Sequence, residues 1–189
     1  MKARTATVVG NPTPAINASF SLRNRFVRWV WGLVYCSIFR TSPRSMHALR
    51  SALLRLFGAQ LGENCHIYPK AVIWAPWNLV CGNHTGIADG VIVYNQAMIT
   101  LGCHVTVSQG AHLCTGTHDY EDRSFRLVAK PITVGDDAWV CAEAFIHPGI
   151  TIGKGAVIGA RSVVTRDVEP WSVVSGFPAV KIRERVLRS

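Results

Sequence analysis

Aliphatic residues recur at every sixth position along most of this chain, from Leu61 to Val168. A six-residue period fits neither the 3.6-residue turn of an α-helix nor the alternation of a single strand, so it predicts short strands separated by turns. One coil of such strands cannot bury its own aliphatic residues, and neighbouring coils therefore have to stack into a solenoid with a continuous core. The fifteen positions expected to point into this core are Leu61, Ile67, Ile73, Cys81, Ile87, Val93, Leu101, Val107, Leu113, Val134, Val140, Ile146, Ile152, Ile158 and Val164.

Five dipeptides mark where successive coils begin. Each joins an aliphatic residue or Cys to Gly, and each opens a group of three hexads, which predicts a triangular rod of about five coils. Four residues after each opening position the side chain is small or β-branched, as stacking inside a narrow prism requires. The dipeptides are Leu61-Gly62, Cys81-Gly82, Leu101-Gly102, Val134-Gly135 and Ile152-Gly153, and the small residues are Cys65, Thr85, Val105, Ala138 and Ala156.

Three breaks interrupt the period. Two of them are steps of eight residues, which we interpret as insertions of Leu79-Val80 and Ile99-Thr100 at corners of the rod. The third break separates Leu113 from Val134 and contains charges, two aromatic residues and a proline. It predicts an external loop over residues 118–133, and long loops on rigid scaffolds tend to carry function.

The remaining segments differ in composition from the repeats. We predict an extended arm over residues 1–19, a helical segment over 20–60, the solenoid over 61–169 and a basic tail over 170–189, which begins with a hairpin-like turn at Gly176-Phe177-Pro178. Within the helical segment, one helix is expected from Phe20 to Phe39 and a shorter amphipathic one from residue 44 to Gly58. The chain is therefore expected to have an all-β-dominated fold, a parallel β-helix with an N-terminal helical segment and one long external loop.

The net charge of +9 indicates an anionic partner, such as a nucleotide phosphate or a membrane surface. Eight arginines and no acid lie between Arg4 and Arg55. The longest uncharged run of the aromatic helix, Trp29 to Phe39, is too short to span a bilayer, which takes ~20 residues. Two interpretations of residues 20–40 remain open: packing on the solenoid or a sister subunit, and peripheral contact with an anionic membrane.

The six cysteines form no C-x-x-C pair, and at least Cys65 and Cys81 occupy core positions, so we expect reduced thiols. The first nineteen residues are too polar for a signal peptide, which predicts a cytoplasmic protein, with peripheral contact on the inner membrane face as a hypothesis. No phosphate-binding loop motif is present and no nucleic-acid partner is expected. The histidines leave a γ-carbonic-anhydrase-like zinc site as an alternative. The spacing of His112 and His118 does not match that family, and no metal is predicted.

The repeats, the external loop and the ending Gly176-x-Pro178-Ala179-x-x-Ile182 resemble the hexapeptide-repeat acyltransferases. Within these, the chain is similar to galactoside and maltose O-acetyltransferases and, more closely, to acetyltransferases of the colanic-acid-biosynthesis type. The stretches that carry this similarity are SPRSMHALRSALLRLFGA from Ser42, WAPWNLVCG from Trp74 and SQGAHLCTGTHDY from Ser108. Over residues 20–187 the resemblance implies a left-handed β-helix, a homotrimer, acetyl-CoA as co-substrate, and active sites in clefts between subunits.

The resemblance also implies a catalytic role for His118, because Gly116-Thr117-His118 matches the context of the family's general base. A neutral imidazole has a suitable pKa for taking a proton from a sugar hydroxyl. Outside this context, a loop histidine is more often a solvated surface residue. One of the acids that follow His118 could orient it. By position, the backbone N–H near Ala142 would stabilise the oxyanion.

Further site residues follow from the same resemblance. It places acetyl-CoA along Ala142, Ala160, Thr165 and Arg166, with Trp139 packing nearby. Independently of the resemblance, a basic cluster beyond the last coil could bind the phosphates of coenzyme A, and its members are Arg166, Lys181, Arg183 and Arg185. A solvated basic tail is the alternative explanation for this cluster. Tyr94, Asn95 and Asp119 are candidates for binding the acceptor. We predict an acetyl-CoA-dependent O-acetyltransferase acting on a saccharide or a lipid-linked glycan. The alternatives are a zinc-dependent hydratase and a non-catalytic, membrane-associated trimeric scaffold.

Overall fold

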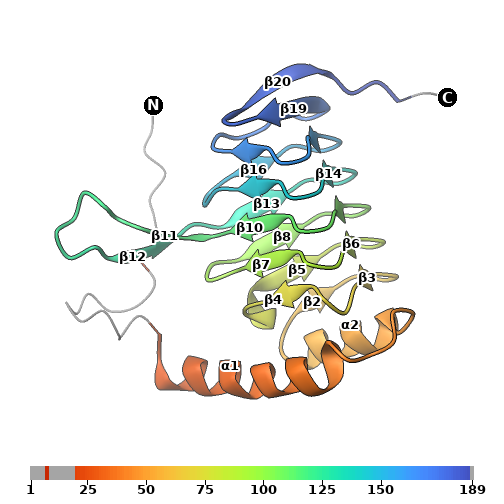
Figure 1. Cartoon of the computed structure of the whole chain (residues 1–189), viewed down its shortest axis with the longest axis vertical. Helices are drawn as coiled ribbons and strands as arrows, with labels where there is room; N and C mark the ends of the chain where they lie inside the picture. Colours follow the sequence, from red (N-terminus) through yellow and green to blue (C-terminus); the bar gives the residue numbers. More distant parts are fainter. Residues whose placement is uncertain (1–6, 9–19, 188–189) are drawn as a thin grey trace.

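A triangular parallel β-helix forms most of the molecule, as the six-residue pattern predicts (Figure 1). The computed structural model describes residues 7–8 and 20–187, so the predicted extended arm lies outside the described residues except for strand β1 (Thr7–Val8). Three sheets form the walls of the prism, with five, seven and five strands. Six strands of the second sheet are parallel, so the stack is slightly taller than the five coils expected.

Each coil contributes one short strand to each wall. The first sheet contains β2 (Gln60–Leu61), β5 (Leu79–Cys81), β8 (Ile99–Leu101), β13 (Ile132–Val134) and β16 (Thr151–Ile152). The second contains β3 (His66–Ile67), β6 (Gly86–Ile87), β9 (Thr106–Val107), β14 (Trp139–Val140), β17 (Val157–Ile158), β19 (Ser172–Gly176) and β20 (Ala179–Glu184). The third contains β4 (Val72–Ile73), β7 (Ile92–Tyr94), β10 (His112–Cys114), β15 (Phe145–Ile146) and β18 (Val163–Val164). The chain turns from the first sheet to the second, to the third and back, which gives a 1–2 corner, a 2–3 corner and a 3–1 corner.

The predicted inward positions form the core. Fourteen of the fifteen are buried, and Leu61, in the first coil, is partly buried. The small residues Cys65, Thr85, Val105, Ala138 and Ala156 are all buried as well. The recurring glycine has a steric cause, because a Cβ added to Gly102 would lie 2.7 Å from the backbone nitrogen of Asp136 in the next coil. Only glycine lets successive coils approach this closely at the 1–2 corner.

The two eight-residue steps were assigned to the wrong residues. Leu79 and Ile99 are not insertions: both are buried, and their backbones pair with each other in β5 and β8. The additional residues form the 3–1 corner, as the 3-10 helix η2 (Pro76–Asn78) in one coil and residues 95–98 in the next. The strands at this wall therefore begin earlier than the hexad pattern indicates.

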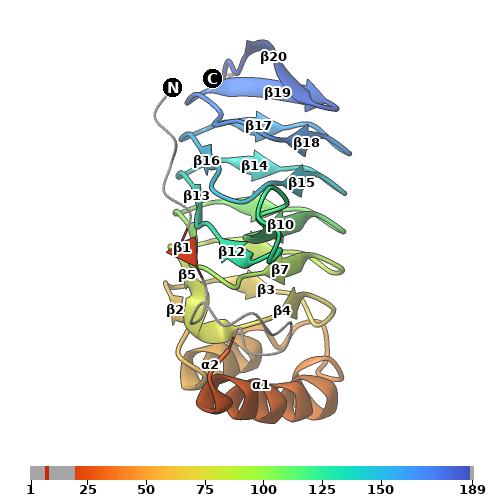
Figure 2. The same ribbon diagram turned by 90° about the vertical axis from the view of Figure 1, so that its left-hand side faces the viewer.

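Two helices close one end of the stack (Figure 2). Helix α1 (Leu22–Val34) continues into the π-helix η1 (Tyr35–Phe39), and α2 (His47–Leu56) follows, starting three residues later than predicted. The indole N–H of Trp31 donates to the Ile73 carbonyl at 2.7 Å, and Trp31, Phe39 and Leu54 are buried against the first coil. These side chains cover the open end of the core, where unpaired strand edges would otherwise meet water.

At the other end the solenoid extends past its predicted limit at residue 169. Strand β19 pairs in parallel with β17, and the chain then reverses through Phe177-Pro178 so that β20 pairs antiparallel with β19. The predicted turn at Gly176-Phe177-Pro178 is confirmed. The segment expected to be a tail is a β-hairpin that covers the last coil.

The external excursion is an ordered hairpin, not an irregular loop. Strands β11 (Gly116–His118) and β12 (Leu127–Ala129) pair antiparallel, and β1 adds to the outer edge of β12. The excursion leaves the prism at the 3–1 corner after β10 and ends before Ile132, which pairs with Ile99 inside the first sheet. Figure 1 shows the hairpin projecting sideways from the stack.

Candidate active site

His118 lies at the end of β11 with an exposed side chain. Its Nδ1 is 2.8 Å from the backbone carbonyl oxygen of Phe125, and its ring stacks on the Phe125 ring at a centroid distance of 4.3 Å and an interplanar angle of 7°. A carbonyl oxygen can only accept a hydrogen bond, so Nδ1 carries the proton in the neutral imidazole. The Nε2 lone pair is then available to accept a proton from a substrate.

The carbonyl of Phe125 orients His118, so the expectation that a neighbouring acid does so is not met. Asp122 accepts from the backbone N–H and the hydroxyl of Ser124 and from Arg126, and these bonds hold the pKa of its carboxyl below the ordinary value. A carboxylate oxygen of Asp119 accepts from the Glu121 N–H at 3.3 Å. Both carboxylates therefore make local bonds in the hairpin tip that presents the imidazole.

The three acceptor candidates lie in different settings. Asn95 is fully buried, and its amide accepts from the Ala75 N–H and donates to the Ala75 carbonyl at the 3–1 corner. Its polar atoms are engaged inside the fold, so we withdraw it as an acceptor-binding residue. Tyr94 is partly buried on the outer face of the third sheet, and Asp119 lies one residue beyond His118 in the hairpin.

Tyr94 belongs to a column of aromatic side chains on this outer face. Its ring contacts Trp74 and His112, and His112 packs edge-on against Phe145 at 4.8 Å. Burial in this column lowers the pKa of His112. The column explains why aromatic and histidine residues recur at outward positions of the third sheet, which the hexad pattern left unassigned.

The residues predicted to bind acetyl-CoA occupy two separate corners of the prism. Ala142 and Ala160 lie at the 2–3 corner, where the Arg161 N–H donates to the Ala142 carbonyl at 2.9 Å. Thr165 and Arg166 follow β18 and lie exposed at the 3–1 corner. Trp139, on the outer face of the second sheet, donates from its indole N–H to the Ser108 hydroxyl at 2.9 Å. Within one chain, these residues therefore do not form one continuous binding site for acetyl-CoA.

His118 is also separated from Ala142 within the chain. Glu143 donates its backbone N–H to the Gln109 carbonyl, so Ala142 lies above the beginning of β10, whereas the hairpin that carries His118 leaves after the end of β10. The third sheet lies between them. A single site that uses both groups has to combine two copies of the chain.

The basic residues near the C-terminus form ion pairs and hydrogen bonds within the chain, which the sequence does not indicate. Lys181 forms ion pairs with Glu169 at 2.8 Å and Glu184 at 2.7 Å, and the Glu169 contact is the main cause of its raised pKa. Arg183 is exposed and donates to the Glu184 carbonyl. Arg185, which the sequence groups with them, donates to the carbonyls of Asp137 and Gly155 and so anchors β20 to the stack.

Two features beside these residues were not predicted from the sequence. The first is Phe125, whose carbonyl and ring hold His118; its only sequence signal is an aromatic residue in a polar loop, and it adopts a positive φ of 48°. The second is the exposed Arg161–Glu143 ion pair, at 2.6 Å, in the corner that contains Ala142. No sequence pattern distinguishes this pair from ordinary corner residues.

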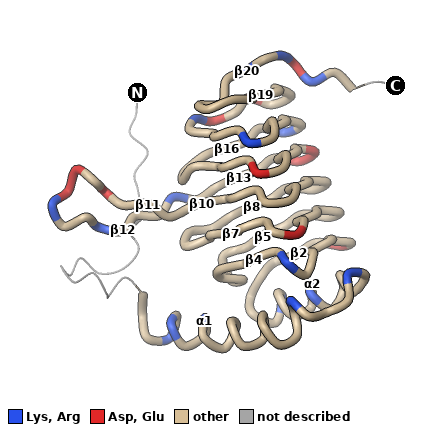
Figure 3. Tube along the Cα trace, in the orientation of Figure 1, with Lys and Arg blue, Asp and Glu red and all other residues tan. Residues whose placement is uncertain are grey.

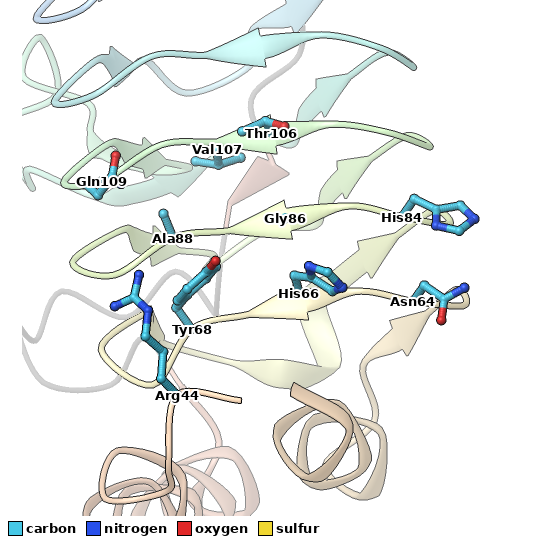
Figure 4. A pocket seen from close by; sticks show the side chains of 10 residues that line it. All are labelled: Arg44, Asn64, His66, Tyr68, His84, Gly86, Ala88, Thr106, Val107 and Gln109. Carbon is cyan, nitrogen blue, oxygen red and sulfur yellow. The ribbon is translucent and has the colours of Figure 1, made fainter. Parts of the chain in front are cut away.

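A cavity of about 360 Å³ with a mixed polar and apolar lining lies on the outer face of the second sheet, in its first three coils (Figure 4). Arg44 reaches it from the segment before α2, paired with Asp89 at 2.5 Å and lying over the Tyr68 ring at 4.4 Å. The full lining is Arg44, Asn64, His66, Tyr68, His84, Gly86, Ala88, Thr106, Val107 and Gln109. The cavity therefore borders the 2–3 corner one coil below Ala142.

Among residues 7–8 and 20–187, no group of three or more His, Cys, Asp or Glu side chains is arranged to hold a metal ion. His112 and His118 lie against the rings of Phe145 and Phe125, and four other histidines pair as stacked rings. His84 and His104 stack at 5.0 Å, and His47 and His66 at 4.8 Å.

Comparison with known proteins identifies the family. Residues 131–166 match the family model described as bacterial transferase hexapeptide (six repeats). A relative in Escherichia coli strain K12, named as the colanic acid biosynthesis acetyltransferase WcaF, is 43% identical over 157 residues, which are 83% of this chain and 86% of the relative.

Two solved structures share the fold. A hexapeptide-repeat-containing acetyltransferase from Vibrio cholerae aligns with a TM-score of 0.79 at 30% identity, covering 87% of this chain and 93% of its own, and has also been solved with acetyl coenzyme A. A galactoside acetyltransferase in complex with coenzyme A aligns with a TM-score of 0.80 at 26% identity, covering 87% and 84% of the two chains. With the repeats, the prism and these similarities together, the chain belongs to the hexapeptide-repeat acetyltransferase family.

Proposed function

We propose that this protein transfers an acetyl group from acetyl-CoA to a hydroxyl group of a saccharide, with Nε2 of His118 as the general base. The relatives support the donor and the acceptor class, since their names include galactoside and colanic acid acetyltransferases and two related structures were solved with coenzyme A or acetyl-CoA. The observation that carries the assignment of the base is the bond between His118 Nδ1 and the Phe125 carbonyl.

In the proposed reaction, Nε2 takes the proton of the acceptor hydroxyl as its oxygen attacks the thioester carbonyl carbon. The C–S bond then breaks, and the imidazolium returns the proton to the leaving thiolate. The bond from Nδ1 to the Phe125 carbonyl keeps the ring in one tautomer and stabilises the positive charge that it acquires. No serine or cysteine nucleophile is required, because the acceptor oxygen attacks directly.

The backbone N–H of Ala142 is proposed as the donor to the developing oxyanion. Among the described residues, no carbonyl accepts from this N–H, while the N–H groups of Cys141 and Glu143 on either side both have partners. The pantetheine arm would pass Ala142 and Ala160, where small side chains leave room for it. Arg166 and Arg183 are exposed and are proposed to contact the phosphates, whereas Lys181 would first have to leave its two carboxylate partners.

We propose that the site is shared between protomers of a homotrimer. The separation of His118 from Ala142 by a whole sheet supports this arrangement, because the hairpin points away from its own prism and would reach the 2–3 corner of a neighbour (Figure 1). Repetition of one head-to-tail contact closes a ring in which every interface is equivalent. Three such interfaces would give three active sites.

The cavity on the second sheet is proposed to bind the saccharide. It opens one coil below Ala142, and its lining combines polar side chains with apolar surface, as a sugar with hydroxyl groups and C–H faces requires. The paired Arg44 and Asp89 offer a donor and an acceptor there, and the Tyr68 ring gives a partly apolar wall. Tyr94 and Asp119 are retained as contributions from the neighbour that supplies the hairpin.

The test is the release of free thiol from acetyl-CoA in the presence of a panel of saccharides. We expect His118→Ala to lower kcat by roughly 10²- to 10⁴-fold, the contribution typical of a general base. Thr133→Ala is the control, because that side chain is exposed on the outer face of the first sheet, which contains none of the proposed site residues. Activity of His118→Ala close to that of the unchanged protein would refute the assigned base, and the absence of thiol release with every acceptor would favour a scaffold.

Mixing two inactive variants tests the shared site. His118→Ala lacks the base and Ala142→Trp blocks the pantetheine track, so neither alone should be active. In randomly mixed trimers, about one interface in four combines an intact His118 with an intact Ala142. Activity should therefore reach about a quarter of that of the unchanged protein. A site built within one protomer would give no recovery.

A further inference from the structure

Helix α1 presents a row of large apolar side chains to solvent. Leu22, Phe26, Trp29 and Leu33 are 81%, 62%, 61% and 53% exposed. At 100° per residue, these four positions cluster on the helix face directly opposite Trp31, which is 3% exposed and faces the solenoid. The row is therefore the outer surface of the helical end of the molecule.

Helix α2 continues the same surface. Leu49 and Leu56 are exposed, and on the helix wheel they lie opposite the buried Leu54, which packs on the first coil. Both helices thus bury one side against the solenoid and turn a second apolar side outward. We call the outward side of the two helices the base, defined by Leu22, Phe26, Trp29, Leu33, Leu49 and Leu56.

The charge of the protein is concentrated in the segment that forms this base. Residues 1–62 contain nine of the twenty Lys and Arg residues and none of the eleven acids, so they account for the whole net charge of +9. The remaining residues hold eleven basic and eleven acidic side chains and are neutral overall. Figure 3 shows basic and no acidic positions along the two helices.

Two arginines border the apolar row. Arg23 and Arg25 are exposed on either side of it, and within the described chain neither has an acidic partner. Arg28 is different: it bonds to Asn24, lies over the Trp74 ring at 4.4 Å, and desolvation lowers its pKa. Arg28 therefore holds α1 on the solenoid, and it is not part of the outward surface.

We propose that the base docks on an anionic lipid surface, with the apolar row entering the headgroup boundary and Arg23 and Arg25 contacting lipid phosphates. An apolar stripe flanked by arginine is the pattern of helices that lie in a membrane interface. A second copy of the chain is a poor occupant, because two bases without any acid would repel each other. In the described residues, no helix is long and apolar enough to cross a bilayer, so contact through the base would be peripheral.

This docking mode would also constrain the acceptor, an extension that rests on the proposed function. In the proposed trimer, a rotation axis along the stack puts all three bases at one end, where they would bind together. Strand β10, which leads into the His118 hairpin, is the third of its sheet from the base. Two strand spacings plus a helix layer place the hairpin ~20 Å above the lipid. A saccharide attached to a membrane lipid is the acceptor class that fits this height.

Co-sedimentation of the full chain with vesicles tests the docking. We expect binding to phosphatidylcholine vesicles with ~30% phosphatidylglycerol, little binding to phosphatidylcholine alone, and weakening with added salt. Arg23→Glu with Arg25→Glu should lower the partition coefficient by at least about tenfold, since each basic residue contributes about fivefold near an anionic surface. Arg123→Glu with Lys154→Glu makes the same change of net charge away from the base and should bind almost unchanged. Equal losses in the two double variants would overturn the assignment of the base.

The apolar row is tested separately with Trp29→Glu and Leu33→Glu together. This variant should lose vesicle binding even at low salt, while it should release thiol from acetyl-CoA with a soluble saccharide as fast as the unchanged protein. Full vesicle binding by this variant would contradict the proposal. No vesicle binding by the unchanged protein would also contradict it, and would favour an acidic protein as the partner. The thiol release of His118→Ala reports only on the proposed catalytic function, and vesicle binding reports only on the docking of the base. The two proposals can therefore fail independently.

Discussion

The stacked coils differ from the two non-repeating segments, the N-terminal helices and the His118 hairpin, in how their residues contribute to the structure. In the coils, an inward position has the same role from one turn to the next, and the part of the chain after residue 62 is neutral overall. In the helical segment and the His118 hairpin, each side chain makes contacts that no other residue repeats, as when Trp31 bonds to the Ile73 carbonyl or the Phe125 carbonyl bonds to His118. The coils therefore supply rigidity, and the non-repeating segments supply the proposed chemistry and the proposed surface contact.

The largest expected effect lies in the stack and compares two isoleucines of the third sheet. Ile146 on β15 is fully buried, whereas Ile92 on β7 points outward and is 38% exposed. We expect Ile146→Ala to lower the free energy of unfolding by about 4 kcal/mol, since it removes buried carbons and leaves a cavity. Ile92→Ala should cost under about 1 kcal/mol. Urea denaturation followed by circular dichroism measures both, and equal losses would mean that inward and outward positions are not distinct.

Helix α2 contains one residue that is buried like a core residue although it is charged. Arg50 on α2 is fully buried, and its guanidinium donates to the Ser42 hydroxyl and to the carbonyls of Pro43, Arg44 and Ile67 at 2.6–2.8 Å. Desolvation lowers its pKa. No carboxylate is among these four bonds, so backbone dipoles compensate most of the charge.

We expect Arg50→Met to lower the free energy of unfolding by about 3 kcal/mol, because several buried carbonyls lose their donor. Arg55→Met is the matched control on the same helix. Arg55 also donates to carbonyls, of Leu61 and Gly62, but is exposed, so water can replace it. A loss at Arg55 equal to that at Arg50 would contradict the role assigned to burial.

The same contrast explains how much the sequence could predict. The fifteen core positions and the coil-opening glycines follow from a period, because stacking imposes the same demand on every coil. The terminal turn follows from its own residues, Gly176-Phe177-Pro178. The strand starts at Leu79 and Ile99 were missed because both corners contain extra residues that shift the hexads. Burial of Asn95 was missed because its partner is a backbone group of Ala75, twenty residues away, and no side-chain pattern encodes it.

The proposed site could be predicted only in part from the sequence, for a related reason. A histidine in a family context can be recognised from its neighbours in the sequence, but the group that orients His118 is a carbonyl, and every residue has one. The hairpin, the outward row on α1 and the separation of Ala142 from His118 depend on how segments lie in three dimensions. The uniform charge of the first 62 residues, by contrast, was visible in the sequence.

The smallest expected effect lies in the hairpin, where Phe125→Ala should change catalysis and leave stability almost untouched. Phe125 is 56% exposed, so its removal should shift the free energy of unfolding by under about 0.5 kcal/mol. Its ring stacks on His118, and such aromatic contacts contribute about 0.5–1.5 kcal/mol, which corresponds to a fall in kcat of roughly two- to tenfold. The carbonyl bond to Nδ1 comes from the backbone and is retained in this variant.

The kinetic constants of Phe125→Ala distinguish a role in positioning His118 from a purely structural role. With Phe125→Ala, kcat should fall while KM for acetyl-CoA stays constant, because the proposed binding residues belong to another corner, and Phe125→Tyr should restore the rate by restoring the stack. A rise in KM for acetyl-CoA with unchanged kcat would instead place Phe125 in the donor site. Loss of stability together with activity would mean that the hairpin is part of the folded stack, and the distinction between the coils and the segments that leave them would not hold at this point.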